Sequence, residues 1–122
     1  MTAKAYLVTG GSGFIGAALT RRLVEDGFWV RVLDDNSRGA PRRLAGIEND
    51  VEFIHGDIRD AETVSIALKA WNGVCHLAFV NGTEFFYSRP ELVLDVGVNG
   101  MTNVITGCLA HWGRRTNTGV QL

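Results

Sequence analysis

The stretch Val8-Thr9-Gly10-Gly11-Ser12-Gly13-Phe14-Ile15-Gly16 decides how this chain of 122 residues is expected to fold. It contains two overlapping glycine patterns, Gly11-x-Gly13-x-x-Gly16 and Gly10-x-x-Gly13-x-x-Gly16. An apolar strand is expected over Ala5–Val8, and a helix is expected over Phe14–Glu25. Glycines at these spacings allow a tight turn, a close approach of backbone to a pyrophosphate and close helix–strand packing. The stretch therefore predicts a dinucleotide-binding loop, with the pyrophosphate at the positive end of the helix dipole.

Asp34 supplies the second part of this pattern. It follows a strand expected over Trp29–Leu33 and lies 18 residues beyond Gly16 and 21 beyond Gly13. A carboxylate about 20 residues after the glycine loop typically binds the adenosine ribose. A glycine-rich turn that serves packing alone is the alternative interpretation, which the acid at this distance disfavours.

Two other glycine-loop classes disagree with the residues present. A Walker P-loop needs Gly-Lys-Ser/Thr, and the two lysines are Lys4 and Lys69, outside the glycine stretch. A methyltransferase loop usually has an acid at the end of the first strand, where this chain has Thr9.

Composition and charge argue against several other classes of protein. Net charge is −1 and the sequence pI is about 6.3, so no global field favours nucleic acid or an anionic membrane. We expect no N-terminal signal peptide, because no basic region followed by an apolar run begins this sequence, and no uninterrupted apolar run approaches 18 residues. Cys75 and Cys108 lack Cys-x-x-Cys spacing, so we expect reduced thiols, no metal site and a cytoplasmic protein.

Apolar runs alternate with helical patterns along the chain. This alternation predicts an α/β fold, a parallel sheet with helices on both faces. The dinucleotide-binding pattern, together with the family resemblance given below, implies a partial Rossmann-like sheet in the order 3-2-1-4. One domain is expected over residues 1–112, followed by a polar tail over 113–122. The first helix is expected to bury a stripe of Phe14, Ile15, Ala18, Leu19 and Leu23. The other expected elements are strands over Val51–His55 and Val74–Leu77 and helices over Ala61–Ala70 and about Glu91–Ala110.

Five segments together resemble the NAD-dependent epimerase/dehydratase family, the extended branch of the short-chain dehydrogenases, many of which act on nucleotide sugars. The resemblance covers about residues 5–110 and is carried by Thr9–Gly16, Val32–Asp35, Gly56–Asp60, Val74–Ala78 and Gly97–Val104. It implies that NAD is the cofactor, that Asp34 binds the adenosine ribose and that Asp57 and Ile58 border the adenine. It also implies that Gly10, Gly13 and Gly16 line the pyrophosphate, with Phe14 and Ile15 at the helix start, and that Leu77 and Ala78 close the middle of the groove. Asp57 has a turn or N-cap role as its alternative, and His76 is expected to be structural.

NAD is expected in preference to NADP. The Asp34 carboxylate would pair with the 2′-hydroxyl and repel a 2′-phosphate. Arg38, Arg42 and Arg43 lie in the surface segment 34–50, where an arginine near that position could instead receive a phosphate. The simpler interpretation of these three arginines is a solvated basic loop.

The sequence departs from the family pattern at the catalytic end. The family's acid/base pair is Tyr-x-x-x-Lys, but Gly10 and Glu91 stand four residues after Tyr6 and Tyr87. The family's helix asparagine would fall at Gly97, and Phe79 stands where a second alanine is usual.

No catalytic residue is therefore assigned. We expect the NAD-binding portion of an epimerase/dehydratase-type oxidoreductase, whether a truncation, a frameshifted product or a natural short form. The alternative is a catalytically silent nucleotide-binding or interaction module, with Phe85-Phe86-Tyr87 as a partner surface or as a loop packed over the sheet. Self-association through the exposed edge of the fourth strand is also expected.

Overall fold

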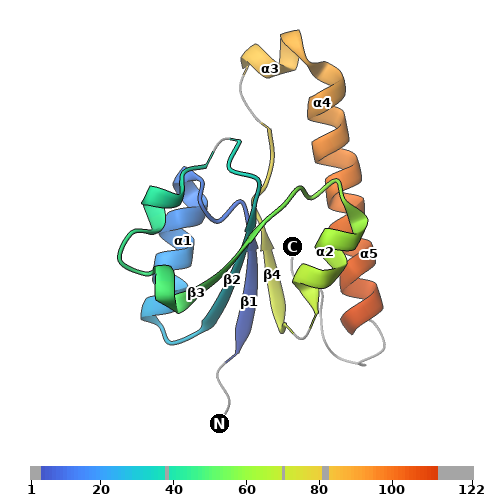
Figure 1. The fold of residues 1–122 in the computed structure, drawn as a ribbon. Coiled ribbons are helices and arrows are strands. Elements are labelled where there is room, and N and C mark those ends of the chain that lie inside the picture. The colour runs from blue at the N-terminus through green and yellow to red at the C-terminus, as the bar shows by residue number, and fades with distance from the viewer. Residues whose placement is uncertain (1–3, 38, 70, 81–82, 113–122) are drawn as a thin grey trace.

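The computed structural model describes residues 4–37, 39–69, 71–80 and 83–112, so the expected tail over 113–122 lies outside the described residues. Its centre is a parallel sheet in the order β3-β2-β1-β4 (Figure 1), which confirms the predicted topology. The strands are β1 (Ala5–Thr9), β2 (Trp29–Asp34), β3 (Val51–His55) and β4 (Gly73–His76). The fourth strand ends one residue earlier than expected, which leaves Leu77 in the loop that follows it.

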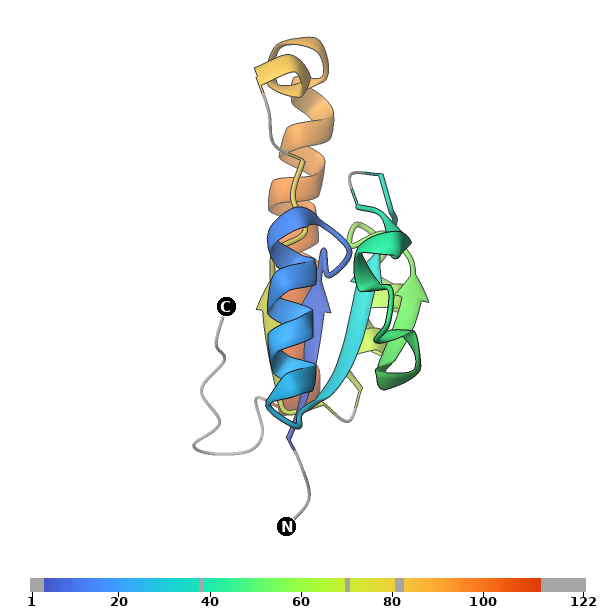
Figure 2. The same ribbon diagram turned by 90° about the vertical axis from the view of Figure 1, so that its left-hand side faces the viewer.

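Helices cover both faces of the sheet. Helix α1 (Phe14–Glu25) lies on one face with the short 3-10 helices η1 (Pro41–Leu44) and η2 (Glu48–Asp50). Helices α2 (Ala61–Leu68) and α5 (Gly100–Trp112) lie on the opposite face (Figures 1 and 2). Successive strand residues serve opposite faces, so Val8 joins the core under α1 while Leu7 joins the core under α2 and α5.

Of the expected buried stripe of α1, Leu19 and Leu23 pack against the core, but Phe14, Ile15 and Ala18 are exposed. Phe14 is 85% exposed and Ile15 is 70% exposed, whereas the buried residues of this helix are Gly16, Ala17 and Thr20. The helix approaches the sheet through small side chains, because a bulky residue would hold its backbone away from the glycine loop. Phe14 and Ile15 are therefore exposed at the start of the helix.

The C-terminal half forms a long, interrupted helix. It begins at α4 (Pro90–Leu94), continues through a π-helical turn η3 (Asp95–Asn99) and runs on as α5. By length and mean hydropathy alone, its 22-residue stretch Pro90–His111 would suffice to cross a membrane. Val96, Val104 and Cys108 on this stretch are buried in the same core as β1 and α2, so one face of it packs on the sheet, while only 28% of the stretch is buried.

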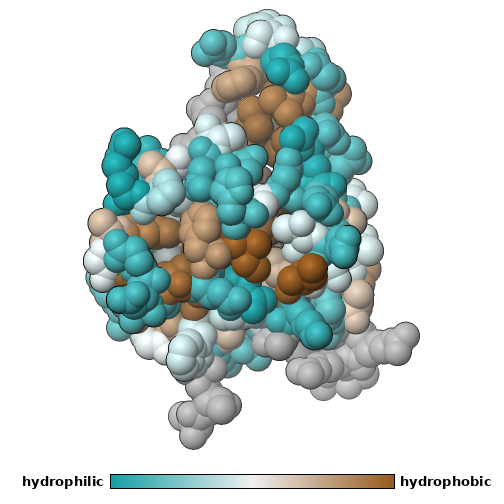
Figure 3. Space-filling view, in the orientation of Figure 1, coloured by the Kyte–Doolittle hydropathy of each residue, from teal (hydrophilic) through white to brown (hydrophobic). Residues whose placement is uncertain are grey.

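A short helix, α3 (Thr83–Ser88), replaces the loop expected at Phe85-Phe86-Tyr87. Phe85 packs against the core shared by α2 and α5, whereas Phe86 and Tyr87 are exposed. The α3–α4 segment projects beyond the sheet, and apolar side chains remain on the surface of this projection (Figure 3).

Candidate functional site

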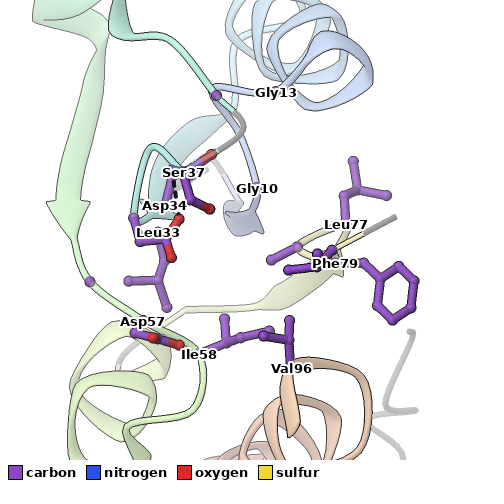
Figure 4. A pocket seen from close by; sticks show the side chains of 15 residues that line it. Gly10, Gly13, Leu33, Asp34, Ser37, Asp57, Ile58, Leu77, Phe79 and Val96 are labelled. Atoms are coloured by element: carbon purple, nitrogen blue, oxygen red, sulfur yellow. Dashed lines mark hydrogen bonds between the residues drawn. The ribbon is translucent and has the colours of Figure 1, made fainter. Parts of the chain in front are cut away.

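A pocket of about 100 Å³ lies where the strands end (Figure 4). The ends of all four strands contribute residues to it, as does Val96 from the π-helical turn. Seven predicted site residues line it: Gly10, Gly13, Asp34, Asp57, Ile58, Leu77 and Ala78. Gly16 is buried in α1, and Phe14 and Ile15 are exposed in the first turn of that helix. Pockets that enclose drug-sized ligands measure about 300–1,000 Å³, so a dinucleotide placed here would extend over the open surface beside this pocket.

Glycine is required at different positions of the loop for different structural reasons. Gly10 has a φ of +75°, and a Cβ there would lie 2.9 Å from the amide nitrogen of Ala78. A side chain at Gly16 would overlap the carbonyl oxygen of Gly10, so this glycine brings α1 against the loop. Gly13 has a φ of −73°, which any residue can adopt, so its backbone conformation does not require glycine. Its bare Cα lines the pocket, where a side chain would enter the ligand space.

The N-terminus of α1 can receive an anion. Gly13 is its N-cap residue and has no side chain to accept a bond from the first helical N–H groups. The first turn of the helix carries no acidic residue. The helix dipole and these backbone donors therefore favour a phosphate at the pocket edge.

Asp34 is buried at the end of β2 and is tied to the glycine loop. Its Oδ2 accepts hydrogen bonds from Ser12 N (3.0 Å) and Ser12 Oγ (2.7 Å), and its Oδ1 accepts one from Asn36 N (2.8 Å). Ser12 Oγ also lies 3.0 Å from Asn36 Oδ1. Since the hydroxyl has one proton, turning it toward Asn36 would free Asp34 Oδ2 to accept from a ligand hydroxyl.

Asp57 makes the turn contact that was its alternative role, and it also lines the pocket. Its Oδ1 accepts from Arg59 N (2.8 Å), as in a turn, while the residue also lines the pocket. The Arg59 guanidinium bonds to Asp57 (Nη2 to Oδ2, 2.6 Å) and to Asp95 (Nη1 to Oδ2, 3.2 Å). This side-chain bonding from Arg59 holds the pKa of Asp57 below its ordinary value. Arg59 thus joins the loop after β3 to the π-helical turn and offsets negative charge beside the pocket.

Thr9 and His76 fix the junction between the glycine loop and the end of β4. Thr9 Oγ1 accepts from Leu77 N (3.0 Å) and Ala78 N (3.2 Å) and lies 2.6 Å from His76 Nδ1. With two N–H groups donating to it, the hydroxyl donates its own proton to an unprotonated Nδ1. Burial lowers the pKa of His76, in agreement with a neutral ring. His76 therefore serves structure, as expected.

The basic segment is only partly a solvated loop. Arg42 is exposed, but Arg43 Nη1 donates to the carbonyl oxygen of Ser12 at 3.3 Å and so lies against the glycine loop. Arg21 in turn donates to the carbonyl oxygens of Arg43 and Ala45. The segment is therefore fastened to α1, and Arg38 lies outside the described residues.

Sequence reasoning missed the residues that support the site: Ser12, Arg59 and the hydroxyl role of Thr9. Each is a common polar residue whose partner becomes apparent only when distant segments meet; Thr9 and His76, for example, are separated by 67 residues. No cluster of three His, Cys, Asp or Glu side chains suited to a metal occurs in the described part of the chain.

Comparison with known proteins places the sequence of this chain in one protein family. The sequence pattern described as "NAD dependent epimerase/dehydratase family" matches residues 6–118. UDP-glucose 4-epimerase of Streptomyces lividans is 35% identical over 98 residues, a match that covers 78% of this chain and 29% of the relative. A 3 beta-hydroxysteroid dehydrogenase/Delta 5→4-isomerase of Mycobacterium tuberculosis is 33% identical over 119 residues, covering 94% of this chain and 29% of the relative.

A solved structure agrees with these sequence matches. The structure of Thermus thermophilus UDP-glucose 4-epimerase in complex with NAD is similar with a TM-score of 0.79 and 30% identity. The similarity covers 87% of this chain and 34% of that structure. The chain therefore spans about a third of the length of the proteins it matches.

Proposed function

Because the chain belongs to the NAD dependent epimerase/dehydratase family, we propose that it binds NAD in the pocket at the carboxyl ends of its strands. The main support for the proposal is that the glycine loop and the residues at the ends of β2, β3 and β4 line the same pocket. The strand order reverses between β1 and β4, and dinucleotides bind across such a reversal in open α/β sheets.

The proposed contacts run along the pocket. The pyrophosphate lies on Gly10, Gly13 and the N-terminus of α1, flanked by Phe14 and Ile15, with Gly16 allowing the close approach of the helix. The adenosine ribose binds Asp34, the adenine lies beside Asp57 and Ile58, and Leu77 and Ala78 form the middle of the groove. A carboxylate at the ribose supports NAD in preference to NADP.

The activity of the complete protein is proposed from its relatives. UDP-glucose 4-epimerases among them support an oxidoreductase acting on nucleotide sugars. NAD supplies hydride transfer in such chemistry. Tyr6 packs edge-on against Phe28, and Tyr87 is exposed on α3, so neither tyrosine lines the pocket. We assign proton transfer to no residue of this chain and expect no turnover from these 122 residues alone.

We also place the protein in the cytoplasm, as its free cysteines suggest. Cys75 and Cys108 are unpaired, and burial raises the pKa of both thiols, that of Cys108 to about 11. Inert, reduced thiols of this kind suit a reducing compartment.

Calorimetric titration with NAD tests the proposal, with Gly13→Val as the decisive variant. The valine Cβ would lie 3.2 Å from the Gly10 carbonyl oxygen, and its methyl groups would occupy the pyrophosphate space. We expect NAD binding to be lost while circular dichroism stays unchanged. Ala18→Val adds the same kind of side chain at an exposed position of α1 and should leave binding intact. Normal NAD affinity in a folded Gly13→Val variant would remove the phosphate role from this loop.

A further inference from the structure

The pocket is divided into a polar half and an apolar half. Its ionisable and hydroxyl side chains come from the last residue of β2 and from the segments that follow β2 and β3: Asp34, Asp35, Ser37 and Asp57. The half beyond β4 is lined by Leu77, Ala78, Phe79, Val80 and Val96, which carry no polar side-chain atom. A ligand that spans the pocket therefore meets hydrogen-bonding groups at one end and apolar surface at the other.

Phe79 lies at the far end of the apolar half. Figure 4 shows its ring on the opposite side of the pocket from Asp34 and Asp57. The residue lines the pocket and is still 50% exposed. Part of the Phe79 surface therefore remains exposed at this outer edge of the pocket.

The Phe79 ring packs against Gly97. A Cβ at Gly97 would lie 2.8 Å from Phe79 Cε2, 3.6 Å from Cδ2 and 3.7 Å from Cζ. The ring therefore packs on the bare backbone of the π-helical turn Asp95–Asn99, in space that a side chain at this position would take. Phe79 and Gly97, which both depart from the family pattern, are thus in contact, and the glycine accommodates the phenylalanine.

The direction of a dinucleotide brings its second base to this place. With adenosine at Asp34 and the pyrophosphate at Gly10 and Gly13, the second nucleoside must extend across the reversal of strand order toward the end of β4. We propose that Phe79, packed on Gly97, is a platform on which the nicotinamide ring stacks. This inference rests on the proposed NAD site. Recognition of this base is then by aromatic and apolar contact.

Calorimetry with NAD and ADP-ribose tests the platform, because ADP-ribose lacks only the nicotinamide ring. An aromatic pair contributes enough that Phe79→Ala should weaken NAD binding by about two- to tenfold. The same variant should leave ADP-ribose affinity within about twofold. Gly97→Ala should shift the ring and weaken NAD selectively, and Phe79→Tyr should retain NAD affinity. Phe86→Ala removes an exposed aromatic residue outside the pocket and is the matched control.

The other possible results of this titration distinguish failure of the platform from failure of the NAD site. Equal losses of NAD and ADP-ribose affinity, or tighter NAD binding by Phe79→Ala, would overturn the platform while leaving the NAD site in place. Failure of the wild-type chain to bind either ligand would reject the proposed function itself. Phe79→Leu keeps apolar volume without a ring, so it supplies the same comparison if the alanine variant does not fold.

Discussion

The single proton of the Ser12 hydroxyl sets how many hydrogen bonds Asp34 can accept from a ligand. In the structure, Oδ2 of Asp34 already accepts from Ser12 N and Ser12 Oγ, and Oδ1 accepts from Asn36 N. One lone pair of Oδ1 remains, and a turn of the Ser12 hydroxyl toward Asn36 frees a second acceptor site. The carboxylate is thus placed by the loop and can still receive two ribose hydroxyls.

We expect the wild-type chain to bind NAD at least about tenfold more tightly than NADP, since hydrogen bonds to a charged group are strong and a 2′-phosphate would face that charge. Asp34→Ala should bring the two affinities close together. Calorimetry with both cofactors measures the ratio, and Asp50→Ala, an exposed carboxylate on η2, is the control. Tighter NADP binding by the wild type would refute the role of Asp34.

The neutral His76 ring makes stability depend on pH. Burial lowers its pKa, so below the unfolded value of about 6.5 the unfolded chain takes up a proton that the folded chain binds only at lower pH. The free energy of unfolding should therefore fall as pH drops from 7.5 to 5.5, by at most about 1.4 kcal/mol per pH unit from this residue. Urea unfolding at both pH values measures the change.

His76→Asn is the matched variant for this effect, because its amide oxygen can accept the proton of Thr9 in place of Nδ1. It should reduce the acid-dependent loss of stability. An identical pH dependence in the variant would assign the effect to other groups.

At the scale of the elements, Arg31 on β2 binds the C-terminal end of helix α2. Arg31 Nη1 donates to the carbonyl oxygen of Ala67 at 2.8 Å, and the guanidinium lies 4.4 Å from the centre of the Trp71 ring. Its Nη2 also pairs with Glu52 Oε2 at 2.9 Å. A cation here bonds the free carbonyls and complements the negative end of the helix dipole.

Arg31→Met should lower the free energy of unfolding by about 1–3 kcal/mol, because it leaves partly buried carbonyls without a donor. The Arg31 side chain is 14% exposed, whereas that of Arg22, paired with Asp26 on α1, is 73% exposed. Arg22→Met should therefore cost less than about 0.5 kcal/mol. Urea unfolding compares the two variants, and equal costs would show that the cap contributes nothing.

At the scale of the whole molecule, the sheet has an open side at β4. This strand pairs with β1 alone among the described residues, and Gly73–His76 carries no Lys, Arg, Asp or Glu. Val98, Ile105 and Leu109 are also exposed along the long helix that follows it. Such an edge and such apolar surface favour pairing with another chain.

We therefore expect the isolated chain to self-associate or to unfold at modest temperature, with NAD raising the melting temperature by mass action. Sedimentation at several concentrations, combined with thermal melting, measures both properties. A monodisperse monomer that melts cooperatively above about 55 °C would contradict the expectation.

The sequence by itself determined the strand–loop–helix–strand unit ending at Asp34 and the parallel order of the sheet. The unit follows from glycine spacing and apolar periodicity, which act between residues close in the chain, and the strand order follows from the resemblance that these motifs carry. It did not determine that Phe14 and Ile15 would be exposed or that α3 would form. The tertiary structure alone brought Phe79 to Gly97, Thr9 to His76 and Arg59 to Asp95. Such contacts join separate elements, and their geometry depends on how the helices pack on the sheet, which local propensity does not encode.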